Sequence, residues 1–193
     1  MRNLMQLTTL LRTKLLSVSL LLLILIAGGV QAQTPEPELV GLKGVDIHVE
    51  MRNDSERRLG IEKAAVYRLV MDALREYKIN YLPVGTSAKL EGRDRADAMP
   101  AGYALLLFSV VVVSGNSLPG YSAAVVEHHL LERVRLERDS SIEIIASVYT
   151  GSKTLLMKNG TPGMIAEEIR RQAREFAAKV RAANSAAKAT LKR

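Results

Sequence analysis

The segment that most constrains the fold is Tyr103 to Val113, the most hydrophobic stretch outside the N-terminal region. In a β-strand, successive side chains point to opposite faces. One row of this segment contains Leu105, Leu107, Val111 and Val113, and the other contains Leu106, Phe108, Val110 and Val112. Because both rows are apolar, the segment is typical of a central strand that is covered on two sides.

The remaining patterns predict an α+β domain. It has a mostly antiparallel sheet of four to five strands, with two amphipathic helices packed on one face. Alternation predicts strands over 45–51, 80–84 and 142–149, the last interrupted at 150–153 and continued over 154–157. Apolar residues spaced four apart predict helices over 61–77 and 162–184.

Residues 121–137 fit two structures. Val126, Leu130, Leu131 and Val134 could form a helical stripe, whereas the β-branched start and the alternation near 133–137 favour a long strand with a bulge. As a strand, the segment would direct His128 to one face and His129 to the other.

The N-terminus predicts export. Arg2, Arg12 and Lys14 precede the apolar run Leu15 to Val30, and small residues follow at Val30-Gln31-Ala32. This order is typical of a cleaved signal peptide over 1–32, and the alternative is an uncleaved membrane anchor. We then expect a leader over 33–44, a single domain over 45–184 and a basic C-terminal tail over 185–193. The expected location is the periplasm or the exterior, and the mature chain is not expected to be membrane-embedded.

Composition narrows the possible functions. The chain has no Cys, which excludes a lipidated N-terminal Cys and disulfides. Its net charge of +7 includes three basic residues of the signal, and the rest of the excess lies in 165–193 without interleaved aromatic residues. We therefore do not expect nucleic acid as a partner. With six Tyr, two Phe and no Trp, the chain is also poor in the aromatic platforms on which small secreted hydrolases bind sugars.

One cluster has the residue types of a metal site: Glu127, His128, His129 and Glu132. In a strand the two histidines cannot share an ion, and His48 is distant in sequence. No nucleophile-elbow serine or phosphate-binding glycine loop occurs. We therefore predict no catalytic residues, no metal and no cofactor, and a chain that is not an enzyme. A small envelope hydrolase or metal-binding protein is the alternative.

Several segments carry a resemblance. They are 41–50 (GLKGVDIHVE), 121–127 (YSAAVVE), 134–148 (VRLERDSSIEIIASV) and 176–184 (FAAKVRAAN). With these, nearly all of the mature chain resembles a group of small exported bacterial proteins of unknown function. More distantly, the order of strands and helices is similar to envelope assembly domains, namely the TolB N-terminal domain and the curli-secretion lipoproteins. These likenesses are structural and imply no site residues.

These patterns together predict a non-enzymatic periplasmic or secreted protein that binds or assembles through an apolar sheet face. A two-layer fold leaves one apolar row of 103–113 without a cover, and large apolar patches rarely stay exposed on monomers. The candidate binding residues are Leu105, Leu107, Val111 and Val113, with the opposite row as the alternative. The expected partner is a second copy, another envelope protein or a small apolar ligand. A signal-anchored membrane protein is a further alternative.

Overall fold

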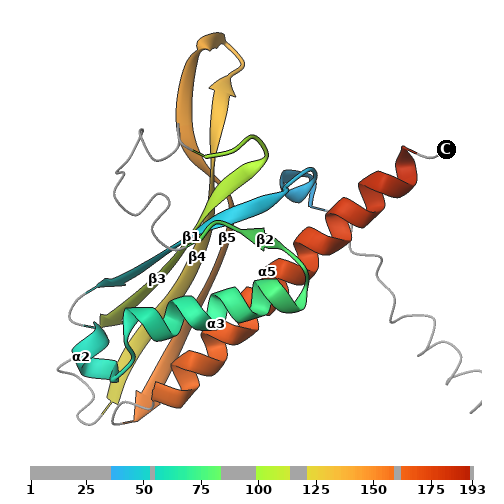
Figure 1. Ribbon diagram of the computed structural model, residues 1–193. Coiled ribbons are helices and arrows are strands. Elements are labelled where there is room, and N and C mark those ends of the chain that lie inside the picture. Colours follow the sequence, from blue (N-terminus) through green and yellow to red (C-terminus); the bar gives the residue numbers. More distant parts are fainter. Residues whose placement is uncertain (1–35, 53–54, 84–98, 114–120, 159–161, 192–193) are drawn as a thin grey trace, which may run out of the picture. The chain divides into compact units, whose positions relative to one another are not determined.

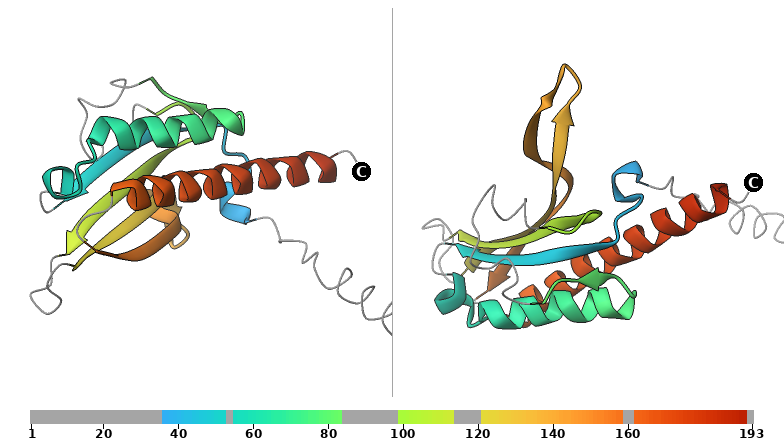
Figure 2. Two further views of the ribbon diagram at one scale, coloured as in Figure 1. Left: turned by 90° about the horizontal axis from the view of Figure 1, so that it is seen from below. Right: turned by 45° about the horizontal axis from the view of Figure 1, so that its top comes forward.

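Five strands form one mixed sheet, and two long helices lie on one of its faces (Figures 1 and 2). The computed structural model describes residues 36–52, 55–83, 99–113, 121–158 and 162–191, without the side chain of Val113. The predicted signal peptide over 1–32 lies outside these residues. The elements are η1 (Pro37–Leu39), β1 (Gly44–Arg52), α2 (Ser55–Leu59), α3 (Lys63–Glu76), β2 (Asn80–Tyr81), β3 (Tyr103–Val113), β4 (Tyr121–Leu136), β5 (Asp139–Lys158) and α5 (Pro162–Thr190). The predicted α+β class is confirmed.

The sheet order is β2-β1-β3-β4-β5, which places β3 at the centre as its two apolar rows predicted. β1 runs parallel to both β2 and β3, whereas the longer β3–β4 and β4–β5 pairings are antiparallel. The segment 121–137 is a strand, so the helical alternative is wrong.

The core lies between the sheet and the helices. Leu106, Phe108, Val110 and Val112 of β3 are at most 2% exposed. They share the core with buried residues of the two helices, which include Val66, Val70 and Leu74 of α3 and Ile165, Ile169 and Phe176 of α5. This row therefore forms the inner face of the sheet, and its burial provides the main stabilisation of the two-layer fold.

β5 is continuous through residues 150–153, so the predicted interruption there is wrong. Gly151 pairs with His128 of β4, and a Cβ at position 151 would overlap the His128 ring. The glycine therefore makes room for a neighbouring ring and does not mark a turn. The bulge predicted in 121–137 lies instead on the neighbouring strand: Leu130 pairs with Tyr149 and Leu131 with Ser147, which leaves Val148 as the extra residue on β5.

The segment before β1 packs against α5. Within the predicted leader, Leu39 and Leu42 are buried, and Lys179 Nζ lies 2.7 Å from Glu36 Oε1. Asn184 accepts a hydrogen bond from the Gly41 amide and donates one to the Leu42 carbonyl, each at 2.9 Å. The helix that holds these contacts continues to Thr190, into the predicted tail.

The helical segment before β2 differs slightly from the prediction. The helix predicted over 61–77 is α3, which starts at Lys63, and the short helix α2 at Ser55 precedes it. The Val112 amide donates a hydrogen bond of 3.2 Å to Ser55 Oγ. A buried hydroxyl thus anchors α2 to the end of the central strand.

Candidate functional site

The predicted binding row lies on the sheet face opposite the helices. Leu105, Leu107 and Val111 are half-buried there, whereas the alternative row is in the core. Both α3 and α5 cover the other face, and among the described elements no helix packs against this one (Figure 2). The structure therefore assigns orientations to the two rows, while the binding role of the outward row stays a prediction.

Polar residues flank this row on the same face. In register, Leu107 lies between His48 of β1 and His129 of β4, and Ser109 lies between Glu50 and Glu127. Ser109 Oγ is buried and finds no hydrogen-bond partner among the residues that the structure describes. The outward face therefore alternates apolar and polar bands across the sheet and is not uniformly apolar.

The two adjacent histidines point to opposite faces, as predicted. His128 is 4% exposed, stacks on Phe108 at a centroid distance of 5.3 Å and bonds through Nδ1 to Gln172 Oε1 at 2.8 Å. Burial lowers its pKa. Over the described part of the chain, no group of three His, Cys, Asp or Glu side chains is placed to hold a metal ion.

The tautomer of His128 follows from its neighbour. Gln172 Nε2 donates to the Val126 carbonyl at 3.1 Å and to Glu168 Oε1 at 2.9 Å, so Gln172 Oε1 is the acceptor and His128 Nδ1 carries the hydrogen. Nε2 is buried without a partner. We therefore assign His128 a packing role in the core.

The β4–β5 hairpin carries an exposed apolar surface that sequence reasoning missed. Leu131 is paired with Leu105 of β3, but from Val134 onward β4 pairs only with β5 among the described strands. We call this two-stranded part, 134–136 and 139–145, the arm, and it extends away from the helices (Figures 1 and 2). Its three isoleucines, Ile142, Ile144 and Ile145, are 43%, 42% and 44% exposed.

The charges of the arm neutralise one another. Glu143 Oε1 lies 2.8 Å from Arg135 Nε, and Glu143 Oε2 lies 3.3 Å from Arg133 Nη1. The hydrogen bond from Arg135 lowers the pKa of Glu143 against a small opposing effect of burial. The Glu143 carboxylate therefore stays ionised and paired. What remains unfavourable in the arm is the exposure of the three isoleucine side chains to water.

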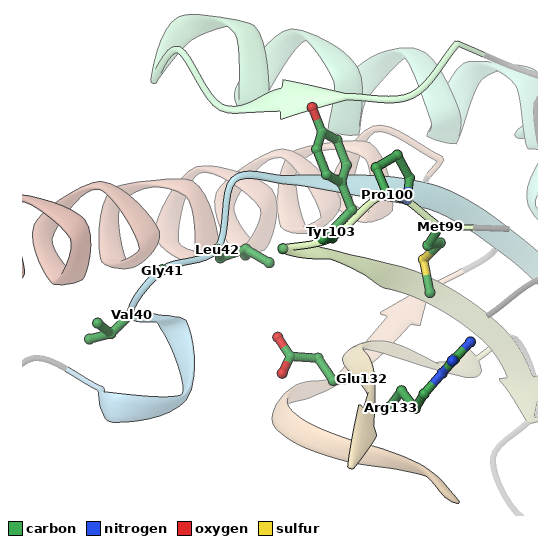
Figure 3. A pocket seen from close by; sticks show the side chains of 10 residues that line it. Val40, Gly41, Leu42, Met99, Pro100, Tyr103, Glu132 and Arg133 are labelled. Atoms are coloured by element: carbon green, nitrogen blue, oxygen red, sulfur yellow. The ribbon is translucent and has the colours of Figure 1, made fainter. Parts of the chain in front are cut away.

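A pocket of about 450 Å³ lies at the root of the arm (Figure 3). Three segments that are distant in sequence line it: Val40 to Leu42, Met99 to Tyr103, and the pair Glu132 and Arg133. The Glu132 carboxylate points into this space, whereas the Arg133 side chain points away from Glu132 (Figure 3). Burial raises the pKa of Glu132.

Comparisons with known proteins do not assign a family. No family model matches the chain, and no curated protein matches it. Among solved structures, a PelC dodecamer from Paraburkholderia phytofirmans has a TM-score of 0.38 at 11% identity, over 77% of this chain and 94% of that chain. A second PelC dodecamer, with one substitution, has a TM-score of 0.36 at 13% identity, over 68% of this chain and 86% of that chain. Scores this low carry no functional conclusion.

Within the described ranges, no helix is long and apolar enough to cross a membrane. The apolar run Leu15 to Val30, on which the signal-anchor alternative depends, lies outside those ranges.

Proposed function

We propose that this chain is a non-enzymatic protein of the bacterial envelope that assembles with a second copy of itself through the arm. The observation that carries the proposal is the exposure of Ile142, Ile144 and Ile145. A two-stranded ribbon is at best marginally stable in water, so an arm with exposed isoleucines gains stability when a partner covers it. The N-terminal signal pattern supports the envelope location.

The free edge of β5 favours a second copy as the partner. β5 ends the sheet order, so its outer edge has no strand beside it among the described residues. Natural edge strands are usually protected by charges, prolines or bulges. Between Ser140 and Ser152 the only charged residue is Glu143, whose carboxylate is already paired with Arg133 and Arg135. The irregularities of the β4–β5 pairing, at Val148 and near the hairpin tip, leave 143–147 as a regular stretch of this edge.

Two such edges can pair antiparallel about a two-fold axis, because the same strand then serves as both partners. The pairing would bring the isoleucines of the two copies together without opposing like charges. The outward row Leu105, Leu107 and Val111 provides a further apolar surface on the same sheet, which stays the candidate face for an envelope protein or a small apolar ligand.

The test is the mass in solution of the chain over 33–193. We expect sedimentation equilibrium to give a multiple of the monomer mass. The double variant Ile144→Lys with Ile145→Lys should shift it to the monomer, since like charges would then face each other across the two-fold axis. The matched control is Ser152→Lys with Thr154→Lys, two exposed positions on the same strand outside the arm. A monomeric wild type, or loss of assembly in the control alone, contradicts the proposal.

A further inference from the structure

Glu132 differs from most of the glutamates in the described ranges in the surroundings of its carboxylate. Lysine or arginine side chains form ion pairs with Glu36, Glu50, Glu76, Glu143, Glu167, Glu168 and Glu175. Glu132 is half-buried, and within the described part of the chain no hydrogen bond or ion pair reaches its carboxylate. Partial burial of a charge without a partner is unfavourable, so the site is poised to accept a cation.

Part of the lining around this carboxylate is apolar, although polar atoms make up the larger share of it. Val40 and Leu42 lie on the segment before β1, and Met99 and Pro100 lie on the segment before β3 (Figure 3). Arg133 also lines the pocket, but its guanidinium is bound across the hairpin to Glu143 at 3.3 Å and does not neutralise Glu132. The pocket thus combines one free negative charge with a short apolar wall.

We propose that this pocket binds a primary alkylammonium group, whose nitrogen pairs with the Glu132 carboxylate while its carbon chain packs against the apolar part of the lining at Leu42 and Met99. An anion would be repelled by the carboxylate. A neutral apolar molecule would bury the carboxylate further without compensating its charge. The same chemistry is found in a free amine and in a lysine side chain of a bound polypeptide. The proposal is independent of self-assembly, because these residues do not lie on the outer edge of the arm.

The test uses n-butylammonium as the probe and n-butanol as its neutral analogue. We expect NMR titration of the chain over 33–193 at pH 8 to show shifts at residues 40–42 and 99–103 with butylammonium. With butanol, binding should be at least about tenfold weaker, as expected when an ion pair worth roughly 1.4 kcal/mol is lost. Nα-acetyl-lysinamide is titrated in parallel. Binding at least as tight as that of butylammonium indicates a polypeptide lysine, and weaker binding indicates a free amine.

The isosteric variant Glu132→Gln removes the charge and should weaken butylammonium binding about tenfold without changing the far-UV circular dichroism spectrum. The matched control, Glu137→Gln, removes the same charge from an exposed position near the hairpin tip and should leave binding unchanged. Binding to the wild type should also weaken as the pH falls through the raised pKa of Glu132. Equal affinity for butanol and butylammonium, or an unchanged affinity in Glu132→Gln, overturns the proposal.

Discussion

At the scale of single residues, position 151 requires glycine because a neighbouring ring lies close to it, and not because the chain turns there. The His128 ring occupies the space where a side chain at position 151 would begin. Gly151→Ala should therefore lower the free energy of unfolding by about 1–3 kcal/mol, the usual cost of forcing an extra group into a packed site. Urea unfolding measures the change.

The control for this substitution is Gly163→Ala. Gly163 lies in the first turn of α5, where an added Cβ meets nothing within 4 Å. Alanine there should be neutral or stabilising, by up to about 1 kcal/mol. In a His128→Ala background, the cost of Gly151→Ala should fall. An equal cost in both backgrounds would show that the ring is not the cause.

Residue patterns predicted the sheet well and its surroundings poorly. The two apolar rows of 103–113 identify a central strand, because a strand that is covered on both faces needs apolar side chains on both of them. Gly151 was misread because a glycine in a strand and a glycine in a turn look alike until the residue on the neighbouring strand is known. Alternation also carries no information on strand direction, so the parallel pairing of β1 with β3 was not predictable from it.

At the scale of elements, α5 holds the sheet through a polar contact that depends on pH. His128 faces Gln172, Glu175 and Lys179 of α5 and Tyr149 of β5, with His129 next to it in the chain. Burial lowers the pKa of His128 below its ordinary 6.5, so the folded chain takes up a proton at lower pH than the unfolded chain does. This contribution to stability is complete above pH 6.5 and is lost as the pH falls through the lowered pKa.

We therefore expect the wild type to lose more stability between pH 7.5 and pH 5.5 than the variant His128→Asn, which cannot titrate but can still donate to Gln172. Thermal unfolding at the two pH values measures the difference. His129→Asn is the control, because His129 is half-exposed on the other face and should leave the wild-type pH dependence in place. An identical pH dependence in wild type and His128→Asn would contradict the assignment.

Neither the arm nor the pocket could be identified from sequence, because each depends on which elements lie next to each other in the folded chain. Ile142, Ile144 and Ile145 read as an ordinary buried strand, and only the end of the β3–β4 pairing shows that they lie beyond the core. From sequence, Glu132 stood out only as one member of a cluster with the residue types of a metal site. Its isolation becomes visible only when residues 40–42 and 99–103 are placed beside it.

At the scale of the whole molecule, the two faces of the sheet should respond differently to the same change. Phe108→Lys places a charge in the fully buried inner face and should unfold the domain, at a cost above about 4 kcal/mol. Leu107→Lys, one residue earlier, points to the outward face and should leave the circular dichroism spectrum folded. Unfolding by both variants would mean that the outward row is structural and would remove it as a binding surface.

The contact between the segment before β1 and α5 bears on the order of folding. Gly41 and Leu42 are held by Asn184, which is synthesised last among the residues that form this contact. The start of β1 pairs with β2 and β3, and the antiparallel β3–β4–β5 meander can assemble from neighbouring segments, but Gly41 and Leu42 gain their contacts with α5 only after that helix has formed. A chain that emerges N-terminus first therefore cannot close this contact until α5, which follows every strand of the sheet, has been synthesised.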